Sequence, residues 1–290
     1  MGFLIHVTAW ERVSRWRRFG AAFARVAALI ALLTVLFDLL GPPIGIYFMA
    51  TWEARKIPAL KVTPQPLKDY SVSEAPGTVL SYFGYRFEVP WNATFKTRGL
   101  PKNTDESGWI DLDFASGQNV LFVAPADQSG LLSEVAHDHS LHAKNSRTVF
   151  GDLTNRSPYD QYSAILNVTP ATIRAFGPRQ DAARGMVLLT IKAIAPAGNL
   201  ATGAFSFELP GKRGFQIGDP RESKSVALEV LDMGGRYVEI ICEATKDGTK
   251  LTQPELNRIL ATLRADPTSS DVKRLTTERG HPLRKNNSGN

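Results

Sequence analysis

The stretch SVALEVLDMGGRYVEIICEA, residues 225–244, decides the fold class. It contains two runs rich in valine, isoleucine and leucine, SVALEVLD and RYVEIICEA, which are typical of β-strands. The MGG between them is a tight-turn sequence, because glycine adopts backbone conformations that other residues avoid. A connection this short joins neighbouring strands in antiparallel orientation. The stretch therefore predicts an antiparallel hairpin.

Further strand patterns lie before this hairpin. The run TVLSYFGYRFEVPW (78–91) indicates one or two strands. The run WIDLDF (109–114) alternates apolar residues with Asp111 and Asp113 and turns through ASGQ into NVLFVAP (119–125). This alternation predicts a second hairpin with one polar face. Three more runs are expected to be strands: GMVLLTIKAI (185–194), GAFSFEL (203–209) and GFQIG (214–218).

Helix signals are fewer, and the strongest comes last. SPYDQYSAIL (157–166) and TPATIRAF (169–176) each begin with a hydroxyl residue followed by proline, a typical helix start. In TQPELNRILATLR (252–264), Thr252 and Glu255 form a capping box. An apolar stripe follows at helical spacing: Leu256, Ile259, Leu260 and Leu263. The sequence therefore predicts an α+β fold, a mostly antiparallel β-sheet domain with a C-terminal amphipathic helix.

Residues 19–50, FGAAFARVAALIALLTVLFDLLGPPIGIYFMA, are expected to form an N-terminal transmembrane helix that acts as a signal anchor. From Val26 to Ala50 the only charged residue is Asp38, and these 25 residues exceed the roughly 20 that a helix needs to cross the hydrocarbon layer. The arginine-rich run RVSRWRRFG (12–20) precedes them, and positive residues stay on the cytoplasmic side. We therefore expect a single-pass protein of the cell membrane with an extracytoplasmic, periplasmic C-terminal domain.

A cleaved signal peptide is the alternative interpretation, because Val26–Phe37 is an apolar run of signal-peptide length. Phe48 stands where a cleavage site would need a small residue, which favours an uncleaved anchor. Pro42 and Pro43 are expected to kink or end the helix. Asp38, just before them, is expected near the outer interface, where water reaches its carboxylate.

These patterns divide the chain into five expected segments. A basic cytoplasmic segment precedes the anchor, and a proline-containing linker follows it. The extracytoplasmic α+β domain comes next, and a polar, basic and disordered tail ends the chain. The segments are residues 1–18, 19–50, 51–76, 77–264 and 265–290, respectively.

The formal net charge of +6 comes from the two ends of the chain. Residues 1–25 carry five arginines and one glutamate, a net +4, and residues 266–290 carry five basic and three acidic residues, a net +2. The middle of the chain therefore balances to zero. A nucleic-acid-binding domain concentrates basic residues on its folded part. The charge distribution therefore excludes nucleic acid as an expected partner.

Two stretches of the expected α+β domain carry a resemblance to a known family. FGYRFEVP (83–90), the antiparallel meander and the closing helix ELNRILATLR (255–264) resemble the PsbP-like α/β/α sandwich. They are also similar to uncharacterised bacterial membrane-anchored extracytoplasmic proteins that open with a like aromatic–Gly–aromatic stretch ending in Pro-Trp. The resemblance covers the outer thirds of residues 77–264. It implies a binding or assembly accessory more often than a catalyst, by analogy from fold to function.

The stretch HDHSLH (137–142) holds three of the five histidines and is the candidate metal site. Its spacing resembles the first metal motif of metallo-β-lactamase-fold hydrolases, which implies zinc. Leu141 stands where those enzymes carry an aspartate, and the only later histidine, His281, lies in the polar tail. Structural or surface histidines are therefore the preferred interpretation. Under the alternative interpretation, the zinc ligands would come from four residues: His137, Asp138, His139 and His142.

The sequence leaves the function between three classes. The first is an accessory protein of the cell envelope that binds a partner or ligand, with the lipid bilayer and an envelope protein as partners. The alternatives are a membrane-tethered metal-dependent hydrolase that uses residues 137–142, and a structural subunit of an envelope complex. No catalytic or cofactor-binding residue is expected, and Cys242 is expected to be a small buried core residue. Whether the protein is an enzyme stays open, with a non-catalytic role favoured.

The histidine cluster gives a first testable prediction. Purified protein, dialysed without chelator, should contain less than stoichiometric zinc by elemental analysis. The double variant His139→Ala, His142→Ala should leave the zinc content unchanged, because structural histidines hold no ion. A tightly held metal in every chain that this double variant loses would contradict the prediction.

Overall fold

The computed structural model describes residues 43–98, 108–125, 130, 132, 150–173, 179–194, 196 and 198–266. These residues confirm the α+β fold with a mostly antiparallel sheet. The chain forms two compact units, each built from two separate segments. Unit 1 takes residues 1–65 and 127–205, and unit 2 takes residues 66–126 and 206–290. The region expected over 77–264 thus contributes to both units.

The expected transmembrane segment lies mostly outside the described residues, since these begin at Pro43. Within the described part of the chain, every helix is too short or too polar to cross a membrane. Residues 43–50 are the first eight residues of helix α2 (Pro43–Lys56), which Pro43 begins. Proline suits that first-turn position, where its missing N–H has no helical partner to lose.

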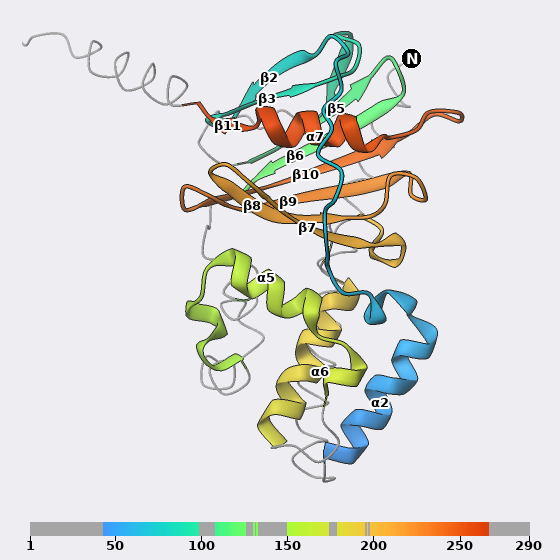
Figure 1. Cartoon of the computed structure of the whole chain (residues 1–290), viewed down its shortest axis with the longest axis vertical. Helices are drawn as coiled ribbons and strands as arrows, with labels where there is room; N and C mark the ends of the chain where they lie inside the picture. The colour runs from blue at the N-terminus through green and yellow to red at the C-terminus, as the bar shows by residue number, and fades with distance from the viewer. Residues whose placement is uncertain are drawn as a thin grey trace, which may run out of the picture. The chain divides into compact units, whose positions relative to one another are not determined.

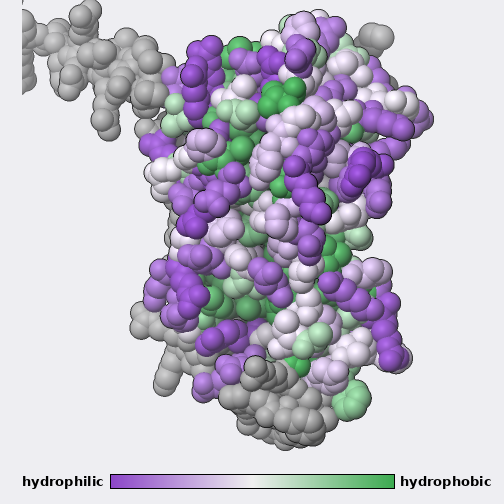
Figure 2. Space-filling view, in the orientation of Figure 1, coloured by the Kyte–Doolittle hydropathy of each residue, from purple (hydrophilic) through white to green (hydrophobic). Residues whose placement is uncertain are grey.

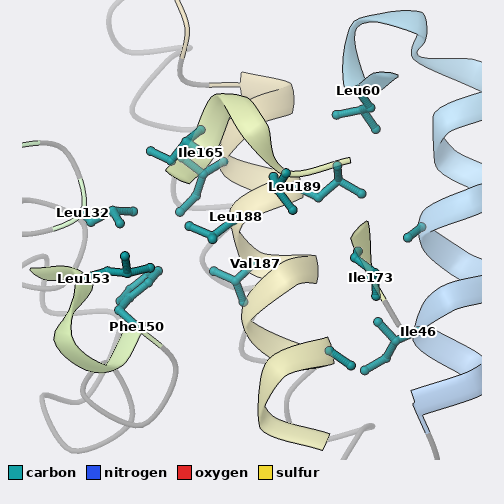
Figure 3. Packing of buried hydrophobic residues seen from close by; sticks show 14 of the residues in the cluster. Ile46, Leu60, Leu132, Phe150, Leu153, Ile165, Ile173, Val187, Leu188 and Leu189 are labelled. Atoms are coloured by element: carbon teal, nitrogen blue, oxygen red, sulfur yellow. The ribbon is translucent and has the colours of Figure 1, made fainter. Parts of the chain in front are cut away.

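Unit 1 is helical in its described residues. Helix α6 lies between α2 and α5 (Figure 1) and packs against both. Their apolar faces meet in a single core (Figure 3) that includes Ile46, Leu60, Phe150, Ile165, Ile173 and Leu189. Besides α2, the elements are η1 (Pro58–Lys61), η2 (Gly151–Asn155), α5 (Pro158–Asn167), η3 (Pro170–Thr172), α6 (Arg179–Ile194) and η4 (Leu200–Thr202).

The prediction for α5 is confirmed, since Ser157 caps the helix by accepting from the backbone N–H of Asp160 at 3.2 Å. The prediction of a strand over 185–194 is wrong, because these residues belong to α6. A short apolar run buried on several sides does not distinguish a strand from a core helix. Gly185 lets α6 approach its neighbour, since a Cβ atom there would lie 3.0 Å from Ile173 Cγ1.

Unit 2 contains two β-sheets. The larger has the strand order β1-β7-β8-β9-β10-β6-β5-β4, and the smaller has the order β11-β3-β2. The strands are β1 (Gln65–Pro66), β2 (Thr78–Tyr82), β3 (Tyr85–Val89), β4 (Phe95–Arg98), β5 (Gly108–Phe114), β6 (Gln118–Ala124), β7 (Ala204–Leu209), β8 (Lys212–Ile217), β9 (Ser225–Met233), β10 (Arg236–Ala244) and β11 (Arg264–Ala265).

The hairpin predicted over 225–244 is confirmed as β9 and β10, which lie at the centre of the larger sheet. Leu228 pairs with Ile240, which pairs in turn with Phe122 of β6. Directly paired residues point to the same face of a sheet. All three are fully buried. This row of side chains is therefore part of the apolar core of unit 2.

The run 78–91, expected to form one or two strands, forms the two strands of the hairpin β2–β3 around Phe83 and Gly84. Both turn residues have positive φ, at 53° and 77°. Positive φ at both central positions is typical of the type I′ turn, whose twist matches that of the strands. The conformation is costly for phenylalanine. The Phe83 ring stacks on Phe122, with ring centroids 6.3 Å apart, and this contact offsets part of the conformational cost.

The capped helix predicted near the C-terminus is confirmed as α7 (Gln253–Thr262), which lies over one face of the sheet (Figure 1). The Glu255 carboxylate accepts from the backbone N–H of Thr252 at 2.8 Å, which completes the capping box. The same carboxylate accepts from the indole of Trp91 at 3.0 Å. The whole predicted apolar stripe is buried: Leu256, Ile259, Leu260 and Leu263.

Residues 51–76, expected to be a linker, instead carry structure at both ends. They continue α2 as far as Lys56 and later run along the polar side of α7. The Asn257 amide donates to the carbonyls of Asp69 and Ser71 at 2.9 and 2.7 Å. The Arg258 guanidinium donates to the carbonyl of Ser73 at 2.7 Å. Proline content does not reveal this docking, because the bonds go to backbone carbonyls, which every residue possesses.

Burial of the α7 stripe should dominate the stability of unit 2. Leu256→Ala should lower the free energy of unfolding by about 2–5 kcal/mol, because it leaves a cavity in place of a fully buried side chain. Ala261→Ser, at an exposed position of the same helix, is the control and should change it by less than about 0.5 kcal/mol. Denaturant unfolding measures both values. Equal effects of the two variants would show that the helix does not cover the core.

Candidate functional site

A groove of about 640 Å³ lies in unit 2, where α7 ends. Its walls come from five places: β3, β11, the turn between β7 and β8, the end of β9 and the last turn of α7. Apolar side chains from the β7–β8 turn and the end of β9 line part of it, namely Leu209, Pro210 and Met233. Three basic residues also line it, Arg86, Lys212 and Arg264, together with the carboxylate of Glu88. The groove therefore combines an apolar wall with positive charge.

The ammonium group of Lys212 already has hydrogen-bond partners within the protein. Its ammonium donates to the carbonyls of Leu260 and Leu263, each at 2.5 Å, and more weakly to that of Ala261. These carbonyls lie at the C-terminus of α7, which carries partial negative charge and attracts cations. Burial lowers the pKa of Lys212. Lys212 therefore fixes the end of the helix rather than serving a ligand.

Arg86 and Arg264 are the charges that remain available. They are directly opposite each other in the pairing of β3 with β11, and both side chains are exposed. Like charges in such a pair repel each other. Within the described part of the chain, neither guanidinium forms an ion pair. The nearby carboxylate of Glu88 is occupied, since it bonds to Arg258 at 2.8 Å.

A pair of neighbouring glutamates is the second group of ionisable residues considered in unit 2. Glu229 of β9 pairs directly with Glu239 of β10, and the row continues into Phe215 and Val123. Glu229 is buried among these apolar neighbours. Desolvation raises the pKa of Glu239, and a hydrogen bond with Glu229 acts in the opposite direction. The two carboxyl groups therefore tend to retain a proton.

Unit 1 contains a buried lysine, Lys192. The Lys192 ammonium donates to the carbonyls of Val62, Leu166 and Val168 at 2.6, 2.7 and 2.7 Å. Burial lowers its pKa to about 8. A pKa in this range can serve catalysis. Here, however, three carbonyls occupy the three N–H donors of the ammonium, so Lys192 holds together the chain segments of the core.

The residues proposed from the sequence as metal ligands cannot be placed. His137, Asp138, His139 and His142 lie outside the described residues. Among the residues that are described, no three histidines, cysteines or carboxylates come close enough together to hold a metal ion. The prediction for Cys242 is confirmed, because its thiol is fully buried and burial raises its pKa.

The glutamate pair makes stability depend on pH. A raised folded-state pKa means that folding favours the protonated form, so this stabilisation is complete below about pH 4.5, the ordinary value. It is lost as the pH rises through the folded-state pKa. Glu239→Gln should therefore raise the free energy of unfolding at pH 8 and change it little at pH 4.

Denaturant unfolding across this pH range measures the effect. Glu74→Gln, at an exposed position, is the control for the loss of one negative charge. A gain from Glu239→Gln that does not grow with pH would contradict a shared proton between the two carboxyl groups.

No family model, curated protein or solved structure matches this chain. The resemblance of residues 83–90 and 255–264 to PsbP-like proteins therefore stays a prediction. The function must be argued from the geometry of the chain itself. In that geometry, the groove with its two available arginines is the feature best suited to recognise another molecule.

Proposed function

We propose that the protein is a membrane-anchored extracytoplasmic binding accessory of the cell envelope, and that its groove in unit 2 binds an anionic group. The observation that carries this proposal is the direct pairing of Arg86 with Arg264. Two like charges face each other in the lining of a groove that also has an apolar wall, without a carboxylate partner among the described residues. Such a pair costs stability when empty and is favourable when an anion lies between the charges.

The chemistry of the lining residues indicates the ligand class. A guanidinium group binds a carboxylate or phosphate through two parallel hydrogen bonds. The wall made by Leu209, Pro210 and Met233 suits an apolar group next to that anion. We therefore propose a ligand in which a carboxylate or phosphate is attached to an apolar body.

Binding is favoured over catalysis because the groove offers no activated group. Among the described residues that line it, Glu88 is the only carboxylate, and Arg258 holds it. The Thr262 hydroxyl donates to the carbonyl of Arg258 at 2.7 Å, within its own helix. A nucleophile needs a base within hydrogen-bonding distance. The lining residues provide none.

The membrane anchor of this proposal rests on sequence. An apolar segment within residues 19–50 follows a run of arginines at residues 12–18. Such a segment holds the chain in the bilayer with the C-terminal part outside the cytoplasm. A groove on a tethered extracytoplasmic unit samples ligands close to the membrane, which suits a binding or assembly accessory.

Calorimetric titration of the purified full chain with phenyl phosphate tests the groove. Phenyl phosphate should bind, and benzyl alcohol, which lacks the anion, should not. Arg86→Gln and Arg264→Gln should each weaken binding about 10- to 100-fold, as expected for the loss of a charge-assisted hydrogen bond. Arg213→Gln should leave the affinity unchanged, because Arg213 pairs with Asp232 and does not line the groove.

The same variants distinguish recognition from a purely structural role. Arg264→Gln should raise the free energy of unfolding by about 0.2–1 kcal/mol, because it removes a like-charge pair. Affinity should therefore fall while stability rises. Equal affinity of Arg86→Gln, Arg264→Gln and the unchanged protein would contradict the proposed function.

A further inference from the structure

Helix α2 has two apolar faces, and unit 1 buries only one of them. Ile46, Ala50 and Ala54, spaced four residues apart, are buried in the core of unit 1. The opposite face carries Phe48 and Trp52, whose exposed fractions are 66% and 58%. Side chains four residues apart lie on the same face of a helix. The outward face therefore presents two large aromatic rings to the surroundings.

This face is unusual for the protein. Most of the surface seen in Figure 2 is hydrophilic, and its hydrophobic areas are small and separate. Among the described residues, eight large apolar side chains are exposed. Half of them fall within residues 48–57, namely Phe48, Met49, Trp52 and Ile57. Such a concentration indicates a surface that meets an apolar environment.

Basic residues follow the aromatic ones along the helix. Arg55 and Lys56 occupy the last turn of α2, and both are exposed. The Lys56 ammonium lies 5.4 Å from the centre of the Trp52 ring and 3.3 Å from the Glu53 carboxylate. An aromatic band next to a basic band is typical of a helix at a membrane surface. There the rings lie at the headgroup level, and the cations attract anionic lipids.

The position of α2 in the chain points to the same environment. Residues 26–42 precede it directly and contain Asp38 as their only charged residue. Because Ile46 and Ala50 belong to the core of unit 1, the apolar segment available to cross the membrane ends before Pro43. The remaining 17 residues still meet the minimum of about 17 for a membrane-spanning helix. Helix α2 thus begins where the chain would leave the bilayer.

We propose that the outward face of α2 lies in the lipid–water interface of the membrane, with Phe48 and Trp52 among the headgroups. This inference rests on the membrane anchor of the proposed function and is independent of the groove. It gives residues 43–56 a second role beside their place in the core. They hold unit 1 against the bilayer surface.

Fluorescence quenching in lipid vesicles tests the proposal. Phe48→Cys and Trp52→Cys are labelled separately with an environment-sensitive fluorophore, and the full chain is reconstituted into vesicles that contain phosphatidylglycerol. Cys242 is fully buried and stays unlabelled. The vesicles carry lipids with a nitroxide quencher either near the headgroup or near the end of the acyl chain. Asn155→Cys, exposed in η2 of the same unit, is the matched control.

Both α2 labels should be quenched at least about twofold more by the shallow nitroxide than by the deep one, because an interfacial helix inserts only to the headgroup boundary. The label at Asn155 should be quenched by neither. A label at Leu33→Cys, inside the apolar segment, should be quenched mainly by the deep nitroxide.

The label at Leu33 distinguishes failure of the interfacial face of α2 from failure of the membrane anchor. Deep quenching at Leu33 without quenching at positions 48 and 52 would overturn the interfacial face and leave the anchor intact. Loss of quenching at Leu33 as well would overturn the anchor of the proposed function and this inference with it. Labels at 48 and 52 that are shielded from water but untouched by either nitroxide would indicate a protein surface over α2, which also overturns the inference.

Discussion

Burial of the apolar side of α7 is the interaction on which unit 2 depends. One side of this helix places four aliphatic side chains in the core, and the other side organises its surroundings through hydrogen bonds. Glu255 caps the helix and holds Trp91, while Asn257 and Arg258 hold the chain after residue 66. A helix that lost its position on the sheet would release all of these contacts at once.

The same helix determines which of the positive charges around the groove remain available. Its C-terminal carbonyls need donors, and Lys212 supplies them from the start of β8. The cation that could otherwise balance an acidic group is thereby committed to the backbone. The chain then places Arg86 and Arg264 opposite each other beside that end. Folding stability alone would select against this pair, and departures of this kind are expected where a protein recognises another molecule.

The features that depend on local sequence were predictable. The cap of α7 needs only Thr252 and Glu255, and the central hairpin needs two β-branched runs and a Met-Gly-Gly turn. The strand expected at 185–194 was wrong because burial on several sides removes the periodicity that identifies a helix. No local sequence pattern indicated the groove. Arg86 and Arg264 are far apart in sequence, and only the pairing of β3 with β11 brings them together.

The alternation of the chain between the two units constrains the order in which they can form during synthesis. Strands β2 to β6 are made first, but their partners β9 and β10 and the covering helix α7 come only after the second segment of unit 1. At about 5–20 residues per second, making that segment takes roughly 4 to 16 s. During this delay, the unpaired edge of β6 is open to other strands. A nascent chain of this topology therefore depends on protection from aggregation until residue 263 has emerged and the helix can close over the sheet.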